Sequence, residues 1–155
     1  MKANVVRRAE SEDATVVARL VCAFRDYYEE SEPDAGQVLA TVRQLLEDRA
    51  TEFLLAGDPP RGFAQLRFRP SVWTGTEDAW LEDLFVDPDA RGAGLGRALT
   101  EACVDRALER GCKRIQLDAN ERNAAAVALY ESAGFRAGRA ERWDGARDLY
   151  FTKWL

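Results

Sequence analysis

The sequence predicts an α+β fold, in which a twisted mixed sheet of six to seven strands is flanked by about four helices. Short apolar runs of β-prone residues recur along the chain. Between them lie longer segments whose apolar residues follow the period of a helix. Residues 80–118 read as a strand, a long helix and a second strand, the pattern of a parallel crossover. With 155 residues, one domain spanning 1–155 is expected.

Composition narrows the range of functions. Hydrophobic residues make up 46% of the chain and charged residues 32%, as in a folded globular protein. No apolar run has the length of a membrane-spanning helix, and the first eight residues lack the apolar region of a secretion signal. We therefore expect a cytoplasmic protein without membrane contact. The net charge of −5 disfavours nucleic acid and suits a cationic small molecule.

The chain contains no histidine, which excludes Ser-His and Cys-His nucleophilic mechanisms and the usual zinc ligand sets. We expect no metal. Carboxylates, tyrosines and backbone amides are left to carry any chemistry. The three cysteines, Cys22, Cys103 and Cys112, show no paired spacing and are expected to be reduced thiols.

The first 33 residues predict a short strand and a helix. The strand covers residues 4–8, and Ser11 is the expected N-cap of a helix that runs to about Tyr28, before Pro33 forces a break. Tyr27, Tyr28 and Glu29 end this helix. Such a terminus is usually a solvated helix end, and its alternative role is an aromatic and acidic rim for a cationic substrate.

The next segment predicts a helix and an antiparallel strand pair. Asp34 and Gln37 resemble a capping box that opens a helix through Leu46. Residues 51–56 and 62–69 are strand candidates separated by a turn at Gly57-Asp58-Pro59-Pro60.

Residues 80–99 are the stretch around which the chain is organised. An apolar strand carrying Glu82 and Asp83 stops before Pro88, and glycines at 92, 94 and 96 open a helix. A helix start has unpaired N–H groups, and residues without a Cβ let a bulky anion approach the backbone. This loop therefore indicates a phosphate or pyrophosphate site. Its spacing matches neither the dinucleotide fingerprint nor the nucleotide-triphosphate loop.

The last third predicts a second βα unit and a hairpin. Gly111 closes the long helix, and residues 113–118 form a strand parallel to 80–86, so Asp118 should face the same opening as the glycine loop. Asn123 is the expected N-cap of a helix closed by Gly134. A turn at Asp144-Gly145 and a strand over 148–155 complete the chain.

Two motifs in this order resemble those of the GNAT superfamily of N-acetyltransferases. The first is R-x-x-G-x-G, at Arg91, Gly94 and Gly96. The second is N-x-x-A-x-x-L-Y-x-x-x-G-F, from Asn123 to Phe135. Within the superfamily, L-E-D-L-F-V at 81–86 and the terminal T-K-W-L look most like spermidine/spermine and thialysine N-acetyltransferases.

This resemblance implies that a splayed pair of parallel strands holds acetyl-CoA. The Val86 amide would point at the acetyl carbonyl, the loop amides would cradle the pyrophosphate, and Tyr130 would lie near the sulfur and protonate the departing thiolate. The residues expected to bind the cofactor are Leu84, Phe85, Val86, Arg91, Gly92, Ala93, Gly94, Leu95, Gly96, Arg97, Asn123 and Tyr130.

The acceptor is expected to be a small cationic amine, deprotonated by a strand carboxylate. Glu82 is the first candidate for the base and Asp83 the alternative, because neighbouring strand residues face opposite ways unless a bulge intervenes. Glu77 and Asp78 are expected beside the same opening. The predicted substrate-binding residues are Tyr27, Tyr28, Glu29, Glu82 and Asp118.

Two other functions stay open for such a chain. The acceptor could be a protein N-terminus or lysine, or the chain could be a coenzyme A-binding regulatory module without catalysis. A homodimer is expected.

Overall fold

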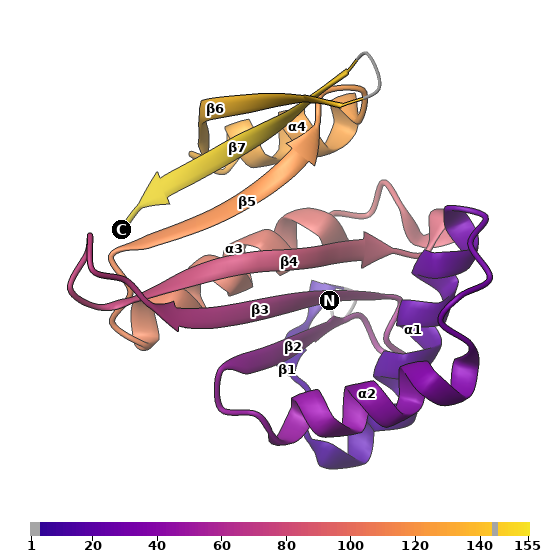
Figure 1. Ribbon diagram of the computed structural model, residues 1–155. Helices are drawn as coiled ribbons and strands as arrows, with labels where there is room; N and C mark the ends of the chain where they lie inside the picture. Colours follow the sequence, from indigo (N-terminus) through magenta and orange to yellow (C-terminus); the bar gives the residue numbers. More distant parts are fainter. Residues whose placement is uncertain (1–3, 144–145) are drawn as a thin grey trace.

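The computed structural model describes residues 4–143 and 146–155, and its strands form one mixed sheet in the order β1-β2-β3-β4-β5-β7-β6 (Figure 1). The strands are β1 Val6–Arg8, β2 Thr51–Ala56, β3 Gly62–Pro70, β4 Glu77–Val86, β5 Arg114–Asn120, β6 Arg136–Trp143 and β7 Ala146–Trp154. The helices are α1 Ala14–Tyr27, α2 Ala35–Glu47, α3 Leu95–Glu109 and α4 Ala124–Ser132, with short 3-10 turns at Ser11–Asp13 and Pro88–Ala90. The predicted fold class is confirmed.

The sheet separates two hydrophobic cores. Alternate residues of β2 point to opposite faces, so Phe53 and Leu55 pack with α1 and α2, whereas Leu54 and Ala56 pack with α3. In Figure 1, α3 passes behind β4, and α1 and α2 lie together on the other side. No helix of the described residues is both long and apolar enough to cross a bilayer.

The parallel pair is confirmed, and it separates soon after it forms. β4 and β5 are in register only at Ala79 with Ile115 and at Trp80 with Gln116. Beyond these pairs the two strands diverge toward their carboxyl ends (Figure 1). Each strand is longer than predicted, because β4 begins at Glu77 and β5 continues to Asn120.

Most predicted helix boundaries are confirmed, and one is wrong. The α2 capping box is present, with the Gln37 N–H donating to Asp34 at 2.9 Å. Ser11 does not cap α1. Asp13 accepts a hydrogen bond from the Glu10 N–H at 2.8 Å, and the Arg7 guanidinium lowers the pKa of Asp13 to about 2. This fixes residues 11–13 as a 3-10 turn, so the helix begins at Ala14.

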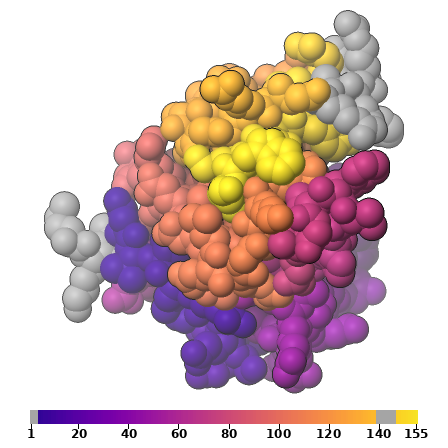
Figure 2. Space-filling model, turned by 90° about the vertical axis from the view of Figure 1, so that its left-hand side faces the viewer, coloured from indigo at the N-terminus to yellow at the C-terminus, as the bar shows by residue number. Residues whose placement is uncertain are grey.

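The end of the sheet where β4 and β5 are still paired lies opposite the end where they diverge, and is called the closed end. Figure 2 shows this end, where the end of β7 (yellow) lies beside the start of β5 (orange) and the β3–β4 connection (magenta). Glu77 pairs here with Arg110 at 3.0 Å, and Asp78 with Arg114 at 2.7 Å. The expectation that both acids border the site is therefore wrong, and both serve to fasten β4 to its neighbours. The predicted turn at Asp144-Gly145 lies outside the described residues.

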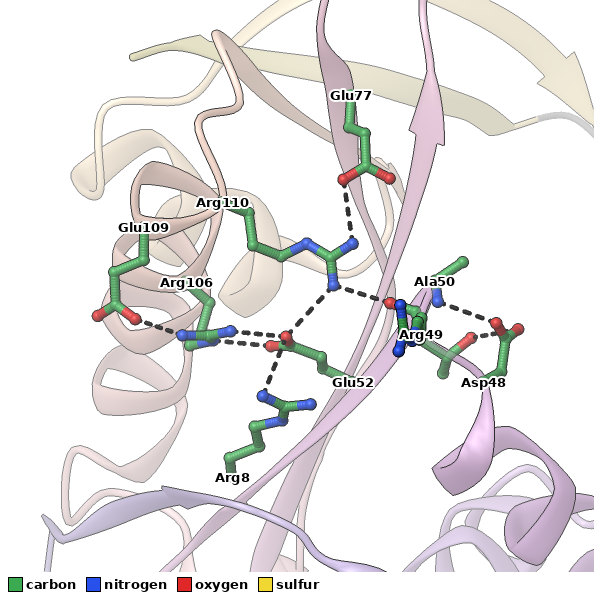
Figure 3. A network of polar contacts seen from close by, with 10 residues as sticks. Arg8, Asp48, Arg49, Ala50, Glu52, Glu77, Arg106, Glu109 and Arg110 are labelled. Carbon is green, nitrogen blue, oxygen red and sulfur yellow. Dashed lines mark hydrogen bonds and ion pairs between the residues drawn. The ribbon is translucent and has the colours of Figure 1, made fainter.

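A buried carboxylate joins α3 to β2 (Figure 3). The Glu52 side chain is 1% exposed and accepts two hydrogen bonds from Arg106 of α3. Arg8 of β1 and Arg110 also lie within ion-pair distance of it. Three cations thus surround one buried anion, which fixes α3 against the sheet.

Candidate functional site

A bulge in β4 reverses the expected direction of one carboxylate. The partner of Gln65 in β3 is Asp83, and the partner of the next residue, Leu66, is Leu81. Glu82 is therefore the extra residue, without a partner in β3. Because of this insertion, Glu82 and Asp83 both border the opening between β4 and β5.

The opening contains a cavity of about 1060 Å³. Its walls come from the end of α1, from β4 and the glycine loop, and from β5, α4 and β7. The predicted residues that line it are Tyr27, Tyr28, Glu82, Asp83, Leu84, Phe85, Val86, Arg91, Gly92, Gly94, Leu95, Gly96, Arg97, Asp118, Asn123 and Tyr130. Ala93 and Glu29 lie outside the lining.

Four further polar or aromatic residues, which were not predicted from the sequence, also line the cavity: Phe24, Asn120, Arg122 and Asp148. Asp148 reaches the site because β7 pairs with β5, which places it opposite Asn120. The Asn120 amide donates to the Asp148 carboxylate at 2.8 Å. A sequence pattern carries no signal for this register.

The start of α3 offers unpaired amides to the cavity. Ala98 is the first residue whose N–H closes a helical turn, on the Gly94 carbonyl at 3.0 Å. The N–H groups of Leu95, Gly96 and Arg97 therefore have no acceptor within the helix. Gly92 and Gly94 have φ of +86° and +88°, a conformation that suits glycine. The donors fit an anionic phosphate group.

The Val86 amide faces the divergence between the strands. The N–H of the following residue, Asp87, donates to the Arg61 carbonyl at 2.8 Å. In an antiparallel pair, neighbouring residues direct their polar groups to opposite edges, so the Val86 N–H points away from β3. It therefore points to the side from which β5 has diverged.

Carboxylates dominate the other part of the cavity. Burial, together with the charges of Glu82 and Asp118, raises the pKa of Asp83 to about 6. Burial and the neighbouring Asp148 also raise the pKa of Asp118. Glu82 itself is exposed. The group has the charge to attract a cation, and Asp83 has a pKa near that of a general base at neutral pH.

Tyr130 lies at the wall formed by α4. Its side chain is 7% exposed, and its ring packs against Phe135 and Phe151 at centroid distances of 5.9 and 6.3 Å. The hydroxyl makes no hydrogen bond with another described residue, and burial raises the pKa of Tyr130. A phenol in this state stays protonated and can donate a hydrogen bond to a group in the cavity.

Asn123 has a structural role beside its place in the lining. Its side-chain oxygen accepts a hydrogen bond from the Ala126 N–H at 3.2 Å and caps α4, as predicted. Only its amide N–H₂ remains to contact a ligand. In the described part of the chain, no group of three or more acidic or cysteine side chains is arranged to hold a metal ion.

Comparison with known proteins gives a consistent result. Residues 17–135 match the family model described as the acetyltransferase (GNAT) family. Thialysine N-epsilon-acetyltransferase of Sus scrofa is 28% identical over 163 residues, covering 95% of this chain and 93% of that protein. The uncharacterized N-acetyltransferase YhfO of Bacillus subtilis (strain 168) is 32% identical over 132 residues, covering 84% and 88%.

A solved structure from Arthrobacter sp. FB24, described as an acetyltransferase, superimposes with a TM-score of 0.82. It is 32% identical, and the match covers 90% of this chain and 89% of that one.

Proposed function

The chain belongs to the GNAT family of acetyl-CoA-dependent acetyltransferases, and we propose that it acetylates a primary amine of a small cationic substrate. Polyamines, lysine-like amino acids and aminoglycosides are the acceptor classes that fit this description. The acetyl group passes directly from acetyl-CoA to the amine, without a covalent enzyme intermediate.

The observation that carries the proposal is the division of the cavity. One part presents the amides that begin α3, together with Arg91, and the other presents Glu82, Asp83, Asp118 and Asp148. The first set suits the phosphates of an anionic cofactor and the second a cationic acceptor. The amine and the acetyl group would meet where β4 and β5 diverge.

The residues present fit acetyl-CoA, which supplies the activated acetyl group. Amides from Arg91 or Gly92 to Arg97 would hold its pyrophosphate, while the backbone of Leu84, Phe85 and Val86 would lie along its pantetheine arm. The Asn123 amide would contact the same arm. The direction of the Val86 N–H supports its role as donor to the acetyl carbonyl oxygen, where negative charge develops during transfer.

A carboxylate must remove a proton from the acceptor. An alkylamine with a pKa of about 10.4 is mostly protonated at pH 7, a deficit of about 4.6 kcal/mol. The strand alternation that would turn Asp83 away from Glu82 is interrupted by the bulge. Burial raises the pKa of Asp83 to about 6. We assign the base to Asp83, directly or through water, and binding of the ammonium to Glu82, reversing the order favoured by the sequence.

Tyr130 would act on the sulfur of the leaving group. A thiol has a pKa of about 8.5, well below that of a buried tyrosine, so full proton transfer from Tyr130 to a thiolate is unfavourable. The raised pKa of Tyr130 supports a hydrogen bond that stabilises the thiolate as it forms. Tyr130 would thus donate a hydrogen bond to the thiolate, whereas protonation of the thiolate was expected from the sequence.

The acceptor rim would combine aromatic faces with charge. Tyr27 and Tyr28 line the cavity at the end of α1, while Glu29 does not. Ring faces can hold an ammonium and its methylene groups, and the carboxylates opposite balance the charge. That a relative of 28% identity is named for thialysine, a lysine-like amine, supports the same class.

A thiol-release assay with acetyl-CoA tests the proposal against polyamines, thialysine, aminoglycosides, neutral amino acids and peptides. We expect the fastest release with multiply charged amines, and an acceptor KM that rises as salt approaches about 0.5 M. A preference for peptides would make the chain a protein acetyltransferase. Coenzyme A binding without release for any acceptor would identify a regulatory module.

A cytoplasmic location, a single domain over 1–155 and a homodimer remain predictions of the sequence analysis. Cell fractionation, limited proteolysis and sedimentation equilibrium test them in turn.

A further inference from the structure

Arg91 connects three parts of the cavity. Its Nε donates to the Val86 carbonyl at 3.0 Å, at the end of β4. Its Nη1 lies 3.3 Å from the Tyr27 hydroxyl at the end of α1. The guanidinium carbon lies 4.6 Å from the centre of the Tyr27 ring and 5.7 Å from that of Phe85. The Arg91 side chain thus contacts both the end of β4, where the acetyl group is proposed to lie, and Tyr27 on the proposed acceptor rim.

Within the described part of the chain, no carboxylate balances the charge of Arg91. Arg97, also in the lining, pairs with Glu101 at 3.0 Å. Arg91 forms no ion pair with any described acidic residue, and its hydrogen bonds go to a carbonyl and a phenol. These contacts use Nε and Nη1 and leave Nη2 as a donor. Arg91 is therefore a cation in the cavity that is held in place and still available to an anion.

We propose that Tyr27, on the acceptor rim, is a positioning residue for the cofactor and acts through Arg91. The inference rests on the proposed placement of acetyl-CoA against the glycine loop. The Tyr27 ring covers one face of the guanidinium and, with the Val86 carbonyl, restricts it to one orientation. A free arginine side chain loses about 2 kcal/mol of rotamer entropy when an anion fixes it. Tyr27 removes part of that loss before the phosphate arrives.

Tyr28 provides a matched control in the next position. Tyr27 is 50% exposed and Tyr28 56%, and both line the cavity. The Tyr28 ring packs edge-on against Phe24 and Tyr27, with centroids 5.3 Å apart in each case. The hydrogen bonds and cation–π contacts of Arg91 with described residues go to Val86, Tyr27 and Phe85 and not to Tyr28. The two tyrosines therefore differ mainly in their relation to the guanidinium.

The test is the affinity for coenzyme A, measured by calorimetry on the full chain without an acceptor. Tyr27→Leu should weaken binding about threefold to tenfold, the range of a partly exposed cation–π contact. Tyr27→Phe keeps the ring and should recover most of the affinity, because the contact of the ring face with the Arg91 guanidinium does not need the hydroxyl. Tyr28→Leu should stay within about twofold of the wild type.

A double-mutant cycle decides whether Tyr27 acts through Arg91. In an Arg91→Gln background, which has no cation for the ring to hold, Tyr27→Leu should cause no further loss of affinity. Additive losses would show that Tyr27 touches the cofactor directly and would overturn the proposal, as would equal losses for Tyr27→Leu and Tyr28→Leu. Thermal unfolding of each variant verifies that it is folded.

A separate variant keeps this inference distinct from the proposed function. Gly94→Val tests whether the cofactor lies against the loop at all. If Gly94→Val weakens binding and Tyr27→Leu does not, only the role of Tyr27 fails. If wild type binds and Gly94→Val leaves affinity unchanged, the placement of the cofactor fails with it.

Discussion

Arg106 of α3 donates two hydrogen bonds to the carboxylate of Glu52 of β2, from Nε to Oε2 at 2.8 Å and from Nη2 to Oε1 at 2.7 Å (Figure 3). Burial opposes ionisation of Glu52, but the hydrogen bonds of Arg106 and the charges of Arg106, Arg8 and Arg110 outweigh it and lower the pKa of Glu52. The Glu52 carboxylate is therefore the buried, ionised centre of a cluster of arginines that are themselves partly exposed.

Glu52→Gln should lower the free energy of unfolding by about 3–5 kcal/mol at pH 7, because three arginines then face a neutral amide. Glu109→Gln is the control, since Glu109 binds the same Arg106 but is 61% exposed, and should cost at most about 1 kcal/mol. Urea denaturation measures both. A group whose pKa is lowered on folding loses its contribution as the pH falls, so the Glu52→Gln deficit should narrow in acid. Equal effects of the two variants would contradict the central role of Glu52.

Gly94→Val should reduce the affinity for coenzyme A by at least about tenfold, the equivalent of one charge-assisted hydrogen bond. A β-branched side chain at φ +88° strains the loop and blocks approach of the anion to the amides that begin α3. Gly75→Val, at φ +70° in the β3–β4 connection, carries a similar backbone strain at the closed end of the sheet. Calorimetry should find its affinity unchanged. A loss of affinity in both variants would point to unfolding as the cause.

Asp83→Asn should reduce kcat/KM by about 10²- to 10⁴-fold and remove the rise in rate centred near pH 6. The rise is expected because only the ionised carboxylate accepts the ammonium proton. Glu82→Gln should keep the rise but move it to lower pH, since the Glu82 charge contributes to the raised pKa of Asp83. Its acceptor KM should increase. Loss of the rise in Glu82→Gln, with its retention in Asp83→Asn, would transfer the role of base to Glu82.

Asp83→Asn should also stabilise the fold at pH 8. The pKa of Asp83 is raised from 3.8 to about 6, so the folded chain binds this proton more tightly than the unfolded chain does. The folded state therefore loses stability as the pH rises through about 6, by at most about 3 kcal/mol. Urea denaturation of the variant and wild type should differ at pH 8 and much less at pH 4. Asp105→Asn, at an exposed position on α3, is the control and should change the free energy of unfolding by at most about 0.5 kcal/mol.

Tyr130→Phe should lower the single-turnover rate of acetyl transfer by about 10- to 100-fold, the worth of one hydrogen bond to a charged group. The ring contacts with Phe135 and Phe151 remain in the variant, so coenzyme A affinity and melting temperature should change little. A single-turnover rate equal to that of the wild type would assign Tyr130 to packing alone.

Local sequence signals predicted the elements that depend on local chemistry. The α2 start follows from Asp34 and Gln37, three residues apart within one turn, and β2 has the predicted bounds. Ser11 failed as a cap because Arg7, from the preceding strand, fixes Asp13 instead. The hydrogen bonds between Arg7 and Asp13 form only when β1 packs beside the 3-10 turn, so the local sequence does not reveal them.

The residues proposed to bind the cofactor could be grouped from the sequence because the strand, the loop and the start of α3 are consecutive in the chain. The residues proposed to bind the acceptor come from separate strands. The position of Asp148 depends on the register of β7 against β5. The directions of the Glu82 and Asp83 side chains depend on a bulge that is visible only in the pairing of β4 with β3. Glu77 was misplaced because five strand residues span about 17 Å, so nearness in sequence did not mean nearness in space.

The two cores on opposite faces of the sheet make the protein modular. The core shared by α3 and α4 supports the glycine loop and Tyr130, whereas the core under α1 and α2 supports the rim that we propose meets the acceptor. Substitutions in the second core can reshape the rim without repacking the first, so new acceptors are accessible to evolution or design while the acetyl donor stays the same. Arg91 of the glycine loop and Tyr27 of α1 make the contact that connects the two parts, and a redesigned rim has to keep this contact.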